Sequence, residues 1–324
     1  MSSFNPGQGW LDNKGNHINA NGGGILLHGN TYFWYGEHKI EGEIGNTAQV
    51  GVHLYISADL YNWKDEGIVL RVDETNSNTE ISKGCILERP KVLFNEKTNK
   101  FVMWFHLEPK DQNYSSAHTG VPVSNSPRGP FRFIKSSRPN KGIWPLNVKK
   151  FHKKRFQKLR KNYCGGPECM PYHVDSLNLL GRDFEIGQMS RDITLFKDDD
   201  GKAYQLYLSE VNSTLHISQL SDDNLSQSGT YKRFFQYRFM EAPTIIKKNG
   251  KCFIIASGCT GWNPNATRSA SADNIFGPWT ELSIPCIGEN ANTTFNSQDT
   301  FILKVKNTEN YIFMADRWKP SDPI

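Results

Sequence analysis

The sequence predicts an all-β protein, a five-bladed β-propeller, from three observations. Five segments repeat one pattern: a polar residue, an apolar strand, a turn rich in Gly, Asn, Asp and Lys, and a second strand rich in aromatic residues. A third strand and a short fourth strand follow four of the five segments. Aromatic residues make up 12% of the chain, which favours strands. Four short antiparallel strands per repeat are typical of propeller blades.

Each repeat begins with a polar residue at the start of its innermost strand. The spacing is regular, since Asn21 to Phe33 and Glu241 to Phe253 each span twelve residues. The five segments are NGGGILLHGNTYFWYG from Asn21, ERPKVLFNEKTNKFVMWF from Glu88, RDITLFKDDDGKAYQLYLS from Arg191, EAPTIIKKNGKCFIIAS from Glu241 and SQDTFILKVKNTENYIFMAD from Ser297.

The outer strands repeat less regularly than the inner ones. Phe-Gly-Pro-Trp at 276–279 and Arg-Gly-Pro-Phe at 128–131 are the same turn in two repeats. Only 26 residues follow Gln298, against about 45 in a full repeat. We therefore expect a truncated fifth blade: either the chain is a fragment, or its N-terminal segment completes that blade.

An insertion interrupts the repeats between blades two and three. Glu88 and Asp192 are 104 residues apart, whereas the corresponding spacings elsewhere are 67, 49 and 57, so the insertion covers about 136–186. It contains the basic run Lys149 to Lys161, whose eight Lys and Arg residues exceed the whole net charge of +5. A solvated surface insertion with a short amphipathic helix explains this run better than a nucleic-acid site. We expect residues 1–324 to form one domain.

Composition and cysteine spacing exclude several classes of protein. No apolar run approaches the roughly 20 residues of a membrane helix, and no heptad pattern persists. The cysteines lack zinc spacing. Cys252 lies in an apolar strand and is predicted to be a core thiol, whereas Cys164 and Cys169 either form a local disulfide or stay free. No signal peptide is visible. The protein is therefore either cytoplasmic, or secreted or periplasmic with its signal peptide removed; five Asn-x-Ser/Thr sequons favour secretion.

The residues that start the inner strands are the candidate site. Because the innermost strand of each blade lines the central channel, these residues should converge at one end of it. Carboxylates across a cleft rimmed with aromatic side chains fit glycoside hydrolysis, in which one protonated acid donates to the leaving oxygen. The converging residues are Asn21, Glu88, Asp192, Glu241 and Gln298. Candidates for stacking on a sugar ring are Trp34, Tyr35, Trp104, Trp262 and Trp318, although a place in the core is the simpler explanation for any one of them.

The motifs resemble glycoside hydrolase family 43, a family of inverting five-bladed propellers, and most closely its exo-β-1,3-galactanase branch. The resemblance implies a glycosidase that releases galactose from the β-1,3-galactan backbone of arabinogalactan-type glycans. Seven motifs carry it, in this order: INANGGGILLHGNTYFWYGEHK, ERPKVLFN, GQMSRDITLFKDDDG, FMEAPTIIKKNGK, SGCTGWNPN, FGPWTEL and FNSQDTFIL.

By this resemblance, Glu241 is the general acid, Asp192 tunes its pKa and orients it, and Glu88 and Glu37 contact the sugar in the −1 subsite. Most members of the family carry an Asp as general base where this chain has Asn21. The galactanase branch lacks that Asp and has a Gln at the position of Gln298, which holds the nucleophilic water. A neutral amide is a very weak base, so its role is positioning. We expect the side chains of Glu241 and Gln298 to face each other roughly 6.5–9.5 Å apart, as inversion requires.

Two other functions stay open from the sequence. One is an α-L-arabinofuranosidase or β-xylosidase with a rebuilt base, and the other is a non-catalytic sugar-binding propeller. We expect no cofactor, although scattered histidines leave room for a structural cation in the central channel. The expected partner is a polysaccharide or oligosaccharide, with neither nucleic acid nor membrane bound, and the expected state is a monomer.

Overall fold

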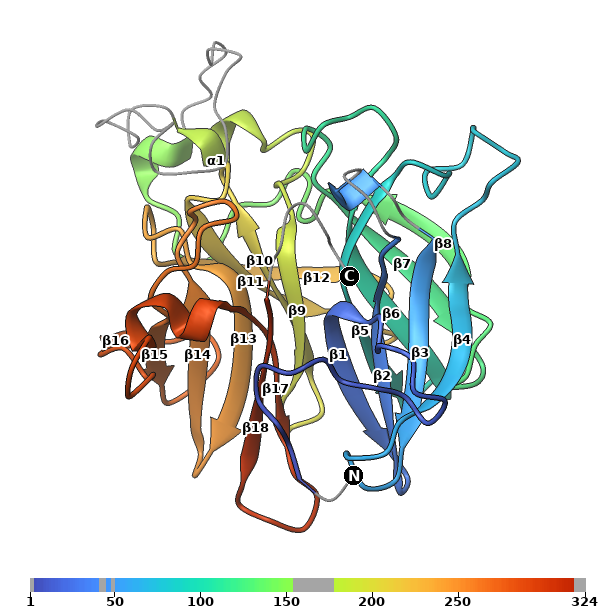
Figure 1. The fold of residues 1–324 in the computed structure, drawn as a ribbon. Coiled ribbons are helices and arrows are strands. Elements are labelled where there is room, and N and C mark those ends of the chain that lie inside the picture. The colour runs from blue at the N-terminus through green and yellow to red at the C-terminus, as the bar shows by residue number, and fades with distance from the viewer. Residues whose placement is uncertain (1–2, 41–44, 48–49, 154–177, 318–324) are drawn as a thin grey trace. The chain divides into compact units, whose positions relative to one another are not determined.

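The computed structural model describes residues 3–40, 45–47, 50–153 and 178–317 (Figure 1). The chain divides into two compact units. Unit 1 comprises Met1–Ser115, Gly120–Ser136 and Lys319–Ile324, and unit 2 comprises Ser116–Thr119 and Ser137–Trp318. Within the described residues the strands form four antiparallel sheets of four strands and one of two. No helix in this part of the chain is long and apolar enough to cross a membrane.

Unit 1 contains the first two sheets, and the strands of each follow one another in chain order. A short 3-10 helix, η1 (Gly45–Thr47), lies between β2 and β3. The first sheet is β1 (Asn21–His28), β2 (Thr31–His38), β3 (Gly51–Ser57) and β4 (Lys64–Arg71). The second is β5 (Ile86–Asn95), β6 (Lys100–Glu108), β7 (His118–Ser124) and β8 (Arg132–Ser137), of which His118, Thr119 and Ser137 belong to unit 2.

Unit 2 contains the other three sheets, again built as meanders (Figure 1). Their strands are β9 (Arg191–Lys197), β10 (Ala203–Ser209), β11 (Thr214–Leu220) and β12 (Gln227–Phe234); β13 (Glu241–Lys248), β14 (Lys251–Ser257), β15 (Arg268–Ala272) and β16 (Thr280–Leu282); and β17 (Gln298–Lys304) and β18 (Tyr311–Asp316), which follow the 3-10 helix η5 (Ala291–Asn296). All five predicted hairpins are confirmed, and the fifth sheet has two strands in this part of the chain.

Each unit has its own apolar core. In unit 1 the core is formed by β1 to β6 together with the segments that follow them, and Tyr35, Leu54 and Phe105 are fully buried in it. In unit 2 the sheets that begin at β9 and β13 share a core containing Leu206, Ile254 and the thiol of Cys252, as the sequence predicts. Because both faces of these sheets are covered, strands such as β10 are buried along their whole length.

After Ser137, the insertion lies outside the sheets where it is described. β8 ends at Ser137, β9 begins at Arg191, and the described residues between them include only two short helices, η2 (Lys150–Lys153) and α1 (Leu179–Arg182). Residues 136–137 of the predicted insertion belong to β8, and its described residues 138–153 and 178–186 contain no strand. Most of the basic run, as well as Cys164 and Cys169, lies outside the described residues.

Four inner strands share a bulge near their start, which follows the first residue of β1, β9 and β13 and the third residue, Glu88, of β5. In β1, Asn21 pairs with Glu37 and Gly24 pairs with Tyr35, so one extra residue is inserted. β5, β9 and β13 shift in the same way. The first bulge residue has a left-handed backbone in each case: Gly22 (φ 59°), Arg89 (56°), Asp192 (43°) and Ala242 (54°). Such bulges re-aim side chains at the end of a sheet.

The predicted register is wrong by one residue in the third blade. Arg191, not Asp192, starts β9 and pairs with Leu208, as Glu241 pairs with Ser257 in β13. Asp192 occupies the bulge position instead. The number of residues between one repeat and the next does not show where in the strand the bulge lies. The repeat spacing alone therefore could not reveal which residue begins β9.

Candidate functional site

Glu241 begins β13, and both of its carboxylate oxygens are engaged. Its Oε1 accepts a hydrogen bond from the Cys259 Sγ at 3.3 Å. Its Oε2 accepts one from the Gln298 Nε2 at 3.2 Å. The side chain is only partly buried. Two neutral donors therefore fix the orientation of this carboxyl group.

Gln298 begins β17, the inner strand that neighbours β13. Besides Glu241, its Nε2 donates to the Ser257 Oγ at 2.9 Å, and Ser257 Oγ in turn donates to the Glu241 carbonyl at 3.3 Å. The expected separation of 6.5–9.5 Å between the two side chains is therefore wrong for this structure. The reason is that the two residues occupy the same position on adjacent strands, where an amide donor reaches a carboxylate acceptor directly.

Asp192 and Cys259 complete this group in unit 2. The Cys259 side chain is 6% exposed. Burial, the charge of Glu241 and the hydrogen bond to it raise the pKa of the thiol, and the charge of Asp192 adds to the effect, so Asp192 acts on the same place. The structure thus brings together three of the predicted residues, from β9, β13 and β17.

The loop from β14 to β15 carries both Cys259 and Trp262. Asn265 closes this loop: its Oδ1 accepts from the Gly258 backbone N–H at 2.6 Å, and its Nδ2 donates to the Gly258 carbonyl and to Thr260 Oγ1. Trp262 is 44% exposed. It therefore remains a candidate for stacking on a sugar ring.

Glu88 is the third residue of β5 in unit 1, two residues after the strand begins, and it lies in a dense polar network. Its Oε1 accepts from the Tyr114 hydroxyl at 2.6 Å and from Asn46 Nδ2 at 2.7 Å. Its Oε2 lies 2.8 Å from His106 Nδ1. The other ring nitrogen of His106 lies 3.0 Å from Glu108 Oε1. An imidazole between two carboxylates donates to both only when it is protonated.

The electrostatics agree with a charged histidine. Burial alone would lower the pKa of His106, but its hydrogen bonds to Glu108 and Glu88 and their charges raise the pKa to about 9. Burial alone would likewise raise the pKa of Glu88, but His106, together with Lys39 and Tyr114, lowers it well below its usual value. At neutral pH Glu88 is therefore an ionised acceptor.

Glu37 is a buried member of an ion pair in unit 1. It is 2% exposed, its Oε2 lies 2.5 Å from Lys39 Nζ, and its Oε1 accepts from the Arg89 backbone N–H at 2.8 Å. A Cβ at Gly22 would lie 2.3 Å from Oε1, so only glycine fits there. Asn21, which pairs with Glu37 in the sheet, is half-buried. The geometry gives Glu37 a supporting place beneath the bulge.

Trp34 and Tyr35 lie in the core, which contradicts their prediction as sugar contacts. Tyr35 is fully buried, and its hydroxyl donates to the Pro127 carbonyl at 2.6 Å. Trp34 is 8% exposed and packs against Trp10 and Trp63. Adjacent residues of a strand point to opposite faces, and both faces of β2 are covered. Trp104 is also buried, and Trp318 lies outside the described residues.

Three further described histidines, His38, His53 and His216, pair with acids or with each other. The Nδ1 atoms of His38 and His53 are 2.9 Å apart, and His53 Nε2 lies 2.7 Å from Asp65 Oδ1. His216 Nε2 lies 2.9 Å from Glu210 Oε1. In the part of the chain that the structure describes, no group of three or more His, Cys, Asp or Glu residues could hold a metal ion.

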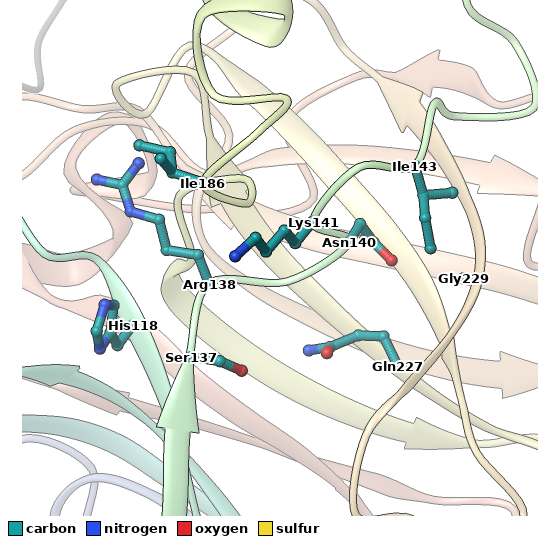
Figure 2. Close-up of a pocket in the computed structure, with 9 residues that line it drawn as sticks. All are labelled: His118, Ser137, Arg138, Asn140, Lys141, Ile143, Ile186, Gln227 and Gly229. Carbon is teal, nitrogen blue, oxygen red and sulfur yellow. The ribbon is translucent and has the colours of Figure 1, made fainter.

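Unit 2 also contains a hollow of about 440 Å³, separate from the Glu241 group (Figure 2). Figure 2 shows that its walls come from the segment after β8, including Arg138 and Asn140, and from β12, including Gln227. Asn140 Nδ2 donates to Tyr207 and Ser218 in the blade. None of the candidate site residues lines this hollow.

Sequence reasoning missed the partners of the two acids. Cys259 was seen only within the SGCTGW motif, and Asn46, His106 and Tyr114 were not connected to Glu88. A signal existed for Cys259: in an antiparallel hairpin the end of β14 meets the start of β13, so residues just after Ser257 must approach Glu241. The partners of Glu88 come from separate loops and strands, and no spacing rule finds them.

Comparison with known proteins gives consistent similarities. The sequence model of glycosyl hydrolases family 43 matches residues 175–320. A solved GH43 β-1,3-galactosidase, BT3683, with galactodeoxynojirimycin, is 47% identical, with a TM-score of 0.88 over 98% of this chain and 91% of that one. An exo-β-1,3-galactanase from Clostridium thermocellum is 35% identical (TM-score 0.75), covering 96% of this chain and 58% of that one. One from Phanerochaete chrysosporium with β-1,3-galactotriose is 32% identical (TM-score 0.77), covering 98% and 61%. A search of curated proteins gave no match.

Proposed function

Since the chain belongs to glycosyl hydrolases family 43, we propose that it is an inverting exo-glycosidase that releases galactose from β-1,3-galactan, the backbone of arabinogalactan-type glycans. The observation that carries this proposal is the pairing of Glu241 with Gln298 in a chain that has Asn21 in place of an aspartate base. The similar proteins are a β-1,3-galactosidase and exo-β-1,3-galactanases, which supports galactose as the released sugar.

In the proposed reaction Glu241 gives its proton to the glycosidic oxygen as the bond from that oxygen to the anomeric carbon breaks. A water molecule attacks the same carbon from the opposite face, and its proton passes to solvent. Glu241 is left ionised and takes up a proton from solvent before the next turnover. The charge of Asp192 acts on the Cys259 thiol beside Glu241. We assign Asp192 the role of favouring the protonated form of Glu241, because a second negative charge nearby disfavours ionisation of a carboxyl group.

Gln298 holds the attacking water in this proposal. Its amide contacts Glu241 at 3.2 Å, whereas an inverting site places roughly 6.5–9.5 Å between the acid and the group opposite. The amide therefore has to leave Glu241 when substrate binds. Because an amide is a very weak base, orientation of the water is its contribution.

Two further residues serve binding. Glu88, kept ionised by His106, accepts hydrogen bonds from sugar hydroxyl groups. Trp262 offers an exposed indole face to a sugar ring. We assign Glu37 and Asn21 to the support of these contacts, since Glu37 is fully engaged with Lys39 and the Arg89 backbone.

The experiment is hydrolysis of β-1,3-galactan and β-1,3-galactotriose by the purified chain, with arabinan and xylan in parallel. Galactose released one unit at a time from the galactan supports the proposal. Release of arabinose or xylose instead would assign the chain to the arabinofuranosidase or xylosidase alternative. Binding without release from any of these glycans would make it a sugar-binding protein.

Several finer properties belong to the same proposal. The five sheets are the blades of one five-bladed propeller, the protein works as a secreted or periplasmic monomer, and catalysis needs no metal or cofactor, because an acid and a positioned water suffice. Full activity after exhaustive dialysis against EDTA supports metal independence. Activity restored by Ca²⁺ would instead identify a structural cation.

A further inference from the structure

The thiol of Cys259 is placed to act on the proposed general acid. It lies 3.3 Å from Glu241 Oε1 and is 6% exposed, on a loop that Asn265 closes with two hydrogen bonds to Gly258. The position of the sulfur is therefore set by the loop and not by the carboxyl group alone. A thiol is a weak but real hydrogen-bond donor.

The surroundings of the sulfur fix the direction of this hydrogen bond. Arg191 Nη1 donates to Asn212 Oδ1 at 3.3 Å, which turns the Asn212 Nδ2 toward Cys259, 3.9 Å from its Sγ. The sulfur thus accepts from Asn212 and donates its own proton to Glu241. Burial and the negative charge of Glu241 raise the pKa of the thiol, so it keeps that proton at neutral pH.

Asn212 itself is held in place by a strained hairpin. Glu210, Val211 and Asn212 all have left-handed backbones, with φ of 54°, 57° and 63°. The carboxylate of Glu210 is buried and paired with Arg233 at 2.5 Å, which holds the hairpin in this form. Three consecutive left-handed residues other than glycine are costly and occur where surrounding contacts enforce them.

We propose that Cys259 is a positioning residue for Glu241: its thiol occupies Oε1, so the proton that Glu241 transfers is carried by Oε2. The inference rests on the proposed function, in which Glu241 is the acid. A proton on Oε1 would face the proton of the thiol, and one of them would have to turn away. Gln298, which donates to Oε2, leaves Glu241 in the proposed reaction in order to orient the attacking water. Only the contact between the Cys259 thiol and Oε1 therefore persists through turnover.

The test compares three cysteine variants. Cys259→Ala removes the donor, Cys259→Ser keeps one, and Cys252→Ala removes a thiol from the core of the same sheet without touching Glu241. A hydrogen bond to an ionised carboxylate lowers its pKa. Cys259→Ala should therefore move the alkaline limb of the kcat/KM profile on β-1,3-galactobiose to higher pH by about 0.5–1 unit.

The controls separate positioning from stability. Cys259→Ser should return the limb toward its wild-type position, and Cys252→Ala should lower the urea midpoint without moving the limb. The other charged groups of this region are unchanged in every variant. Asp192 and Arg268 interact electrostatically with Cys259, and Arg191 contacts Asn212. Asp299 follows Gln298 in β17, and Asp316 pairs with Gln298 in the sheet. An unshifted limb in Cys259→Ala, or an equal shift in Cys252→Ala, would overturn the inference.

A second measurement does not depend on activity. The infrared S–H stretch of Cys259, isolated as the difference between wild type and Cys259→Ser, should lie at the low frequency of a thiol bound to a carboxylate. In Glu241→Gln the band should rise, because a neutral amide oxygen is a weaker acceptor. If the frequency of the S–H band is the same in wild type and in Glu241→Gln, the inference is overturned even if the enzyme cleaves galactan. A shifted band in a chain that fails to cleave galactan would refute the function and keep the contact.

Discussion

Gln298 donates a hydrogen bond to Glu241 at 3.2 Å, and the two residues hold the same position on neighbouring inner strands. This contact joins an amide that cannot act as a base to a carboxyl group that can act as an acid. It also occupies Oε2, which the account assigns to proton transfer. Substrate has to separate the pair, so a complex with β-1,3-galactobiose should show the two side chains well beyond hydrogen-bond distance.

Glu241→Gln should lower kcat on β-1,3-galactobiose by about 10²–10⁴-fold, because the amide has no proton to give to the leaving oxygen. An aryl β-galactoside with a good leaving group should lose less, since it needs less protonation. Initial rates on both substrates check this. Glu281→Gln, an exposed acid on β16, is the matched control and should retain activity. Equal losses on both substrates would remove Glu241 from the acid role.

Changes at Gln298 should separate binding from turnover. Gln298→Ala should leave KM nearly unchanged and lower kcat about 10²-fold or more, because the water is no longer held in line. Gln298→Glu places a second carboxyl group beside Glu241, and two close carboxyls share a proton, which raises the pKa of one of them. Its kcat/KM profile should therefore extend to higher pH. Wild-type kcat in Gln298→Ala would contradict the assignment.

The stability of the protein should fall between pH 6.5 and pH 9 because of His106. The pKa of His106 is raised to about 9 in the folded state, so its stabilisation is complete below the unfolded value near 6.5 and is lost as pH rises through 9. The loss amounts to at most about 3 kcal/mol. Urea unfolding at several pH values measures it. His106→Gln should flatten this pH dependence; an unchanged slope would show that His106 is neutral in the fold.

Glu210→Gln should destabilise the protein by about 3–5 kcal/mol, since it leaves the buried guanidinium of Arg233 without its carboxylate. Breaking the exposed pair of Arg238 and Glu281 by Glu281→Gln should cost less than about 1 kcal/mol. Urea midpoints of both variants give the comparison. Similar small losses in both would mean that the Glu210 pair does not stabilise the fold.

The order of the sheets could be predicted from the sequence because five hairpin segments with the same pattern follow one another along the chain. Hairpin spacing and turn residues place every inner strand. Glu241 and Gln298 begin β13 and β17 as the sequence predicts, whereas Glu88 is the third residue of β5. The one-residue error at Asp192 has a physical cause. A bulge changes which residue faces the neighbouring strand without changing the length of the repeat, so periodicity cannot detect it.

Burial and long-range contacts could not be predicted from the sequence. Trp34 and Tyr35 look like a sugar platform, yet both faces of their strand are packed, and Tyr35 is fully buried. Nothing in the sequence distinguishes Cys259 from an ordinary core cysteine. Only the fold of its loop brings the thiol to Glu241. Likewise the charge on His106 depends on two acids, Glu88 and Glu108, held on either side of its ring.

Proton NMR of the first turnovers on β-1,3-galactotriose tests the central claim most directly. The account predicts α-galactose as the initial product from a β-linkage, because a water aligned by Gln298 attacks opposite the bond that Glu241 protonates. The β-anomer should appear only later, by mutarotation. β-Galactose as the initial product would mean retention through a covalent intermediate, and would contradict the roles given to both residues.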